Sequence, residues 1–171
     1  MPIINAFLAE LEHESATTRR LLERVPEERM GWKPHEKSMT LSRLSGHVAE
    51  LPSWSKTILA DDEFHMDRES RHGYRAHRPE TTAELLRVHD ENVAVYHAVA
   101  EGVTDEHLRG HWRMVGGGKV LLDLTRTAAL RSFVMNHLIH HRGQLSVYLR
   151  LLGVPLPSIY GPTADDPGGF G

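Results

Sequence analysis

The longest periodic segment of the chain begins by Thr127 and ends at Gly153, and it predicts one long helix. Apolar residues return every three or four positions, which places them on one side of an α-helix. Gly153 ends the pattern, and prolines follow it. At about 100° per residue, the predicted stripe contains Leu130, Val134, His137, His141, Leu145, Tyr148 and Leu152. The stripe therefore directs two histidines toward the protein interior.

Three further helices follow from the same period. The first covers Ile3 to Arg24, and the second runs from Leu41 to about Ala60, with Ser38 or Thr40 as its N-cap. A third begins at Thr81 or Thr82 and ends at Gly102. Pro52 falls inside the second helix, where it should produce a kink or break.

The segments between these helices complete the predicted fold. Residues 61–80 are charged and lack periodicity, so they indicate a long surface connection. The run HWRMVGGGKV, with its triple glycine, predicts either a mobile loop or a small hairpin. The tail after Gly153 should run extended over the helices and fray at its end. Together these features predict an all-α four-helix bundle with a long crossover connection, forming a single domain over residues 1–171.

Composition narrows the function. Cysteine is absent, so any metal must be held by His, Asp or Glu. The 20 Lys and Arg against 23 Asp and Glu give a net charge of −3, which argues against a nucleic-acid partner. No stretch approaches the length of a membrane span, and the N-terminus lacks the pattern of a signal peptide. We therefore expect a soluble cytoplasmic protein that binds neither nucleic acid nor membrane.

Histidine is the unusual residue, with 13 in 171 positions. His137 and His141 lie one turn apart on one helix face, a recurrent half-site for a zinc-type ion. His47 lies at the edge of the second helix's apolar stripe and is the candidate third ligand. A single inward histidine is more often a hydrogen-bonded core residue than a ligand. Three at compatible positions favour a shared metal ion, because several buried imidazoles without a common partner are costly.

Other residues are candidates for supporting roles. Gln144, next to His141, and Trp54 and Tyr148 could line a pocket, although packing is the more common role for the two aromatics. Glu50 is the one carboxylate that the second helix offers as a general base. Arg142 is predicted to point away from the stripe and to form a link between helices. His107 and His111 are treated as a chance pair in a loop. The candidates for a pocket or a second shell around the metal are Gln144, Glu50, Trp54, His89 and His140.

The segment NHLIHHRGQLSVYLRLLGVPLP, together with LSRLSGHVAELPSW upstream, resembles the DinB-like (YfiT-like) family of metalloenzymes. The likeness also covers the GWKP stretch and the YGPTADD tail. It implies a helical bundle, often homodimeric, that holds a metal through one histidine of the second helix and a His-x-x-x-His pair of the fourth. By position these are His47, His137 and His141, the residues that the helix faces also select.

The resemblance leaves the reaction open. Its thiol-transferase branch implies a low-molecular-weight thiol as cosubstrate, ionised at the metal. Hydrolysis by activated water is the alternative and would call for a general base such as Glu50. Zn or Ni are the favoured ions, with Fe, Co or Cu also compatible with three imidazoles. Two other hypotheses remain: a non-catalytic metal-binding or stress-response module, and a plain dimerisation domain.

Overall fold

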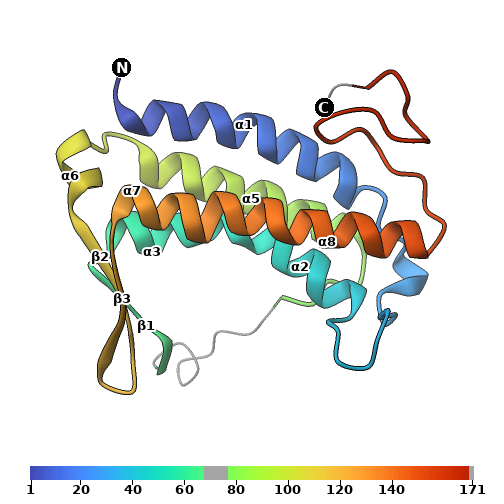
Figure 1. The fold of residues 1–171 in the computed structure, drawn as a ribbon, viewed down its shortest axis with the longest axis horizontal. Helices are drawn as coiled ribbons and strands as arrows, with labels where there is room; N and C mark the ends of the chain where they lie inside the picture. The colour runs from blue at the N-terminus through green and yellow to red at the C-terminus, as the bar shows by residue number, and fades with distance from the viewer. Residues whose placement is uncertain (68–76, 170–171) are drawn as a thin grey trace.

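A computed structural model describes residues 1–67 and 77–169. Figure 1 shows the longer helices side by side along the molecule, with a small sheet at one end. The helical elements are α1 (Ile3–Leu22), η1 (Glu27–Arg29), α2 (Leu41–Glu50), η2 (Leu51–Ser53), α3 (Trp54–Ala60), α5 (Thr82–Ala100), α6 (Asp105–Arg109), α7 (Arg126–Ala129), η3 (Leu130–Asn136) and α8 (His137–Leu151). The strands are β1 (Glu63–His65), β2 (His111–Gly116) and β3 (Lys119–Thr125).

The sheet corrects the predicted fold class. The strands are ordered β1-β2-β3, with β1 parallel to β2 and β2 antiparallel to β3, so the protein is mixed and the prediction of an all-α four-helix bundle is wrong. The GGGKV run forms a β-hairpin, with Gly117 and Gly118 at positive φ in its turn. The predicted long crossover connection, residues 61–80, contains the strand β1. Residues 68–76 of this connection lie outside the described part of the chain.

Helix ends follow local chemistry. Thr40 caps α2 by accepting the N–H of Arg43, and Thr81 caps α5 by accepting the N–H of Glu84. Pro52 lies in η2, a 3₁₀ turn that separates α2 from α3, which confirms the predicted break. The predicted loop around His107 and His111 is wrong, because His107 lies in α6 and His111 begins β2.

The last helical stretch changes its geometry partway. Arg126–Ala129 is α-helical, Leu130–Asn136 is a π-helix, and His137–Leu151 is α-helical again. A π turn holds more residues than an α turn, so later residues lag behind an α-helical count. The buried positions of α8 are accordingly Leu138, Arg142, Leu145 and Leu149. His137 and His141 are half-buried at the edge of that face instead of at its centre.

Two apolar clusters fill the interior. The first, here the sheet-side core, includes Trp112, Tyr96, Ile58, Val134 and Met135. The second, here the α2-side core, includes Leu44, Val48, Leu85, Leu138 and Leu145. Along the last helical stretch, Met135 belongs to the sheet-side core and Leu138 to the α2-side core. His137 lies between these two residues. The histidines thus lie at the junction of two apolar regions. No described helix is long and apolar enough to cross a bilayer.

Candidate metal centre

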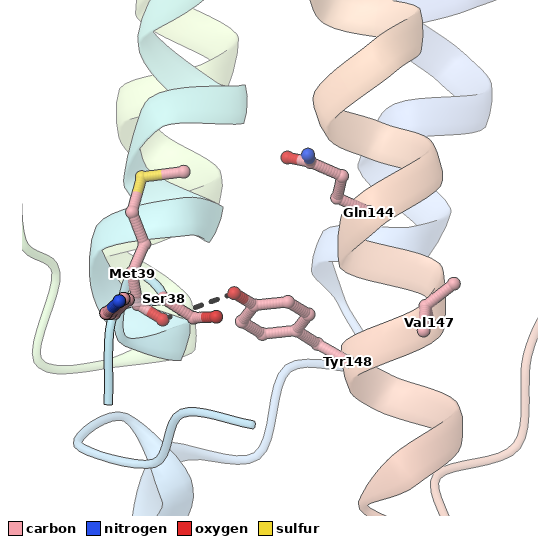
Figure 2. Close-up of a pocket in the computed structure, with 6 residues that line it drawn as sticks. Ser38, Met39, Gln144, Val147 and Tyr148 are labelled. Atoms are coloured by element: carbon pink, nitrogen blue, oxygen red, sulfur yellow. Dashed lines mark hydrogen bonds between the residues drawn. The ribbon is translucent and has the colours of Figure 1, made fainter. Parts of the chain in front are cut away.

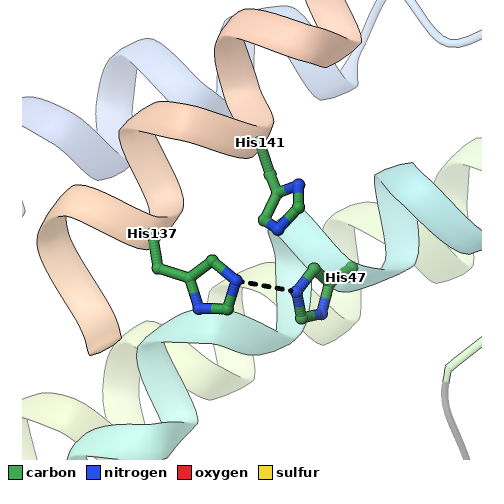
Figure 3. Close-up of side chains that lie close together, drawn as sticks. All are labelled: His47, His137 and His141. Carbon is green, nitrogen blue, oxygen red and sulfur yellow. Dashed lines mark hydrogen bonds between the residues drawn. The ribbon is translucent and has the colours of Figure 1, made fainter. Parts of the chain in front are cut away.

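The structure brings His47, His137 and His141 together from two helices (Figure 3). His47 projects from α2 and the other two from successive turns of α8. The Nε2 atoms of His47 and His137 are 3.3 Å apart. The ring centroid of His141 lies 4.6 Å from that of His47 and 4.7 Å from that of His137. One ring nitrogen from each residue falls within 4.8 Å of the other two.

These distances fit the donor set of one transition-metal ion. Two imidazole nitrogens bound at about 2.0–2.1 Å with tetrahedral angles lie about 3.3 Å apart, the separation found for His47 and His137. His141 offers the third ring nitrogen, within 4.8 Å of the other two. Three neutral imidazoles form a common ligand group for divalent transition metals. The three histidines could therefore hold a single ion.

Glu50 fixes the orientation of His47. The Nδ1 of His47 donates to Glu50 Oε1 at 2.7 Å, because an ionised carboxylate can only accept. Arg43 donates to the same oxygen at 3.1 Å, and the backbone N–H of His77 donates to the other oxygen at 3.3 Å. With Nδ1 engaged, Nε2 of His47 is the nitrogen that faces the other histidines.

Gly46 lets the segment that contacts Glu50 approach α2. A Cβ atom at this position would lie 2.5 Å from the carbonyl oxygen of His77 and 2.8 Å from Pro79. Any larger residue would push residues 77–79 away from the helix. The glycine beside His47 is therefore needed for the contact between the His77 backbone and Glu50.

The other two histidines have partners of the same kind. His141 Nδ1 donates to Gln144 Oε1 at 2.7 Å. The His137 ring is hydrogen-bonded to the backbone of Phe133, in the π-helical η3. The backbone N–H of His137 donates to Val134, not to Phe133 as it would in an α-helix. Each imidazole is thus held by a second contact, the arrangement that orients histidine ligands in metal sites.

Burial keeps two of these imidazoles neutral. Desolvation, together with the smaller effects of the nearby His141 and His47, lowers the pKa of His137 to about 4. Desolvation also lowers the pKa of His141, against a smaller opposing effect of Gln144. Neutral imidazole is the form that binds metal, so both are ready to bind near pH 7.

The depressed pKa of His137 predicts a pH dependence of stability. In metal-free protein, the unfolded state holds the His137 proton more tightly than the folded state does. The free energy of unfolding should therefore fall as pH drops from about 6.5 toward about 4. The partial exposure of the ring makes the loss smaller than for a fully buried histidine.

Urea unfolding of chelator-treated protein across that pH range measures the effect, and His137→Gln should flatten the curve. An equally steep curve for the variant would contradict the assignment to His137.

The other residues that the sequence predicted near the metal lie at different distances from the three clustered histidines. Trp54 lies edge-on to His137, with ring centroids 6.1 Å apart. His140 is exposed, with its ring 4.9 Å from that of His141. His89 is fully buried on α5, where its Nδ1 contacts Asp90, and it is not part of the cluster. Glu50 and Gln144 contact the histidines directly, as described above.

A pocket opens beside Gln144, between the start of α2 and the face of α8 (Figure 2). Its volume is about 450 Å³, and it is lined by Lys37, Ser38, Met39, Gln144, Val147 and Tyr148. The Tyr148 hydroxyl donates to the carbonyl of Met39 at 3.4 Å, and its ring lies edge-on to Trp32. Of the predicted pocket residues, Gln144 and Tyr148 line this pocket and Trp54 does not.

Sequence reasoning missed two contributors to the site. Arg43 lies one turn before His47 on α2, a spacing that could have identified it as a neighbour. The Phe133 backbone depends on the π-helical geometry, for which the sequence carries no recognisable signal.

We expect Glu50→Gln to weaken metal binding about 10- to 100-fold, because the neutral amide no longer fixes the His47 ring through a charged contact. Competition with a chromophoric chelator measures the affinity. Glu63→Gln is the matched control, since Glu63 pairs with Arg113 on the sheet. Equal affinities for the two variants would show that Glu50 does not orient His47.

The protein combines packed helices with a small sheet, and α2 and α8 carry three clustered histidines. These features define a class of small proteins with a candidate metal site. Residues 1–168 match the model of the DinB family, and the chain belongs to this family. It is 26% identical over 170 residues to the uncharacterized protein YrdA of Bacillus subtilis, covering 98% of this chain and 94% of that one.

Two solved structures share the fold. A DinB-like protein from Bacillus cereus has a TM-score of 0.69 and 23% identity, covering 91% of this chain and 97% of its own. The DinB-like protein YjoA from Bacillus subtilis has a TM-score of 0.65 and 23% identity, covering 88% and 94%.

Proposed function

We propose that this protein is a metal-dependent enzyme in which His47, His137 and His141 hold one divalent ion. Zn or Ni is the favoured ion, with Fe, Co or Cu as alternatives. The observation that carries the proposal is the convergence of three imidazoles, each with a second hydrogen-bond partner. Three protein ligands leave a coordination position for a substrate or water, as in catalytic rather than structural zinc sites.

When bound, such an ion acts as a Lewis acid that activates a coordinated nucleophile or polarises a substrate. The chain's own residues supply orientation and shelter. Glu50, Gln144 and the Phe133 backbone fix the three rings, and Trp54 and the two apolar clusters limit the access of water on the buried side. The solvent side stays open, because His137 and His141 lie at the edge of the buried face.

The reaction that we propose is transfer to or from a low-molecular-weight thiol, with hydrolysis as the alternative. Glu50 is already engaged with His47, Arg43 and the His77 backbone, so it serves as a positioning residue and not as a base for water. A thiol ionises near pKa 8.5 and depends less on a separate base than water does. The pocket beside Gln144 is the place for the rest of the substrate.

Metal content tests the proposal. We expect about one ion per chain in untagged protein purified without a metal column, measured by plasma mass spectrometry. His141→Ala should reduce it to near zero. His140→Ala is the matched control, because the neighbouring ring is exposed and outside the cluster. Absence of metal from the wild type, or equal loss in both variants, would contradict the assignment.

A chelator separates an enzyme from a structural module. Removal of a catalytic ion should leave the helical circular dichroism nearly unchanged, whereas removal of a structural ion unfolds the chain. Thiol consumption with model electrophiles, measured with and without restored metal, then tests the reaction. An unfolded apo-protein would favour the non-catalytic metal-binding module instead.

A further inference from the structure

Two pockets border the three clustered histidines along the last helical stretch. The pocket beside Gln144 follows His141 on α8, and Figure 2 shows side chains of α8 facing Ser38 and Met39 across it. A second pocket, here the pocket beside Phe133, has a volume of about 340 Å³. It is lined by Ser132, Phe133, Asn136, His137 and His140. Each pocket contains a clustered histidine or its hydrogen-bond partner, so either could receive part of a substrate that reacts there.

The pocket beside Gln144 presents hydrogen-bond donors. The Lys37 ammonium, the Ser38 hydroxyl and the Gln144 amide belong to its lining. Gln144 Oε1 accepts from His141, which leaves the two N–H groups of the amide for another partner. Within the described residues, none of these three donor groups donates to a protein atom. The described lining includes no carboxylate, and the rest of it is Met39, Val147 and Tyr148.

A lysine distinguishes this pocket from the pocket beside Phe133. Among the described residues that line the two pockets, Lys37 is the only lysine or arginine. Arg43, which lies close to His47, already donates to Glu50. An anionic group would therefore find an unpaired cation in the pocket beside Gln144, and no lysine or arginine in the pocket beside Phe133.

We propose that the pocket beside Gln144 binds a carboxylate of the substrate, at the end remote from the group that reacts at the histidines. This assignment rests on the proposed function. Lys37 supplies the opposite charge, and the Ser38 hydroxyl and the Gln144 amide donate to the carboxylate oxygens. Met39 and Val147 pack against the apolar chain that joins the two ends of the substrate.

The number of charges favours a carboxylate over a phosphate. A carboxylate carries a single negative charge, which the ammonium group of Lys37 balances. A phosphate monoester carries about −1.5 to −2 at neutral pH, so part of its charge would stay uncompensated beside this one cation. The pocket therefore suits a carboxylate better.

Hexanoate and hexanol are matched probes, because they share a chain length and differ in the terminal group. Amide chemical shifts in NMR spectra of the full chain report binding, after chelator treatment so that the carboxylate cannot bind a metal ion instead. Hexanoate should shift the amides of Lys37, Ser38 and Gln144 and bind about tenfold more tightly than hexanol. Lys37→Gln should lower the affinity for hexanoate about tenfold and leave that for hexanol unchanged. Lys33→Gln is the matched control, because Lys33 donates to the Glu36 carbonyl and does not line the pocket.

Several results would overturn the carboxylate assignment. They are equal affinities for hexanoate and hexanol, shifts centred on Ser132 and Asn136, and equal affinities of the Lys37 and Lys33 variants for hexanoate. Hexyl phosphate that binds more tightly than hexanoate would overturn the choice of a carboxylate over a phosphate.

Turnover separates this inference from the proposed function. With the metal restored, Lys37→Gln should raise the KM for ω-mercaptohexanoate and leave its kcat nearly unchanged, with little effect on either value for ω-mercaptohexanol. Equal changes in KM for the two thiols would count against the carboxylate pocket. Selective hexanoate binding by a protein that purifies without metal would keep the pocket and remove the proposed function. A metal-containing protein without selective hexanoate binding would do the reverse.

Discussion

Replacing Arg142 by methionine should lower the free energy of unfolding by about 3–5 kcal/mol, because it leaves Glu14 as a buried carboxylate without its cation. Arg142 is 1% exposed, and its Nη2 lies 2.6 Å from Glu14 Oε2. The Nη1 atom of Arg142 donates to the backbone carbonyl of Glu14 and to Thr18 Oγ1. For a chain of this length, thermal unfolding should shift down by about 6–20 °C, as measured by calorimetry.

The double variant Arg142→Met with Glu14→Leu is the control. It removes both charges, so it should recover a substantial part of the lost stability. The recovery will be incomplete, because the Tyr160 hydroxyl also donates to Glu14 at 2.9 Å. A double variant as unstable as Arg142→Met would indicate that lost packing, and not the unpaired carboxylate, causes the effect.

Trp112→Ala should cost about 3–5 kcal/mol of stability through the cavity that it leaves. Trp112 is fully buried in β2 and packs against Phe64 of β1 and Phe133 of η3. It therefore joins the sheet to the helix that carries His137. Urea unfolding followed by circular dichroism measures the loss.

Trp112→Phe is the matched variant and should cost much less. It keeps a ring in the core, and it removes an indole N–H that has no hydrogen-bond partner among the described residues. Equal losses for the two substitutions would mean that the contribution of Trp112 does not lie in filling the core.

Sequence periodicity could predict most of the helices and the shared face of His137 and His141, because both depend on local spacing. The approach of His47, 90 positions from His137 in the sequence, depends on how α2 and α8 pack, and it was anticipated from the edge of the α2 stripe and from the family resemblance. The β2–β3 hairpin was one of the two alternatives for the HWRMVGGGKV run, but β1 and the sheet as a whole escaped prediction, because the strands are short and the contacts of β1 are not local. β1 has three residues within a charged segment and pairs with a strand that lies almost fifty residues further along. Burial alternates along β2, but over too few positions to stand out.

The same reasoning misplaced Arg142, which was expected outside the stripe and is fully buried. It did anticipate that Arg142 would link helices, as its contact with Glu14 of α1 shows. The error comes from η3, where the count of 100° per residue fails. His89 was a candidate near the metal because its helix face is buried, but face alone does not say which neighbouring helix it meets.

The π-helical segment η3 lets the last helical stretch hold an additional residue without changing the direction of the histidine pair. Because a π turn holds more residues than an α turn, loss of a single residue within 130–136 would let an uninterrupted α-helix form while leaving His137 and His141 facing nearly the same way. An alignment of relatives can therefore show a gap in those seven positions and still describe a chain that brings all three histidines together.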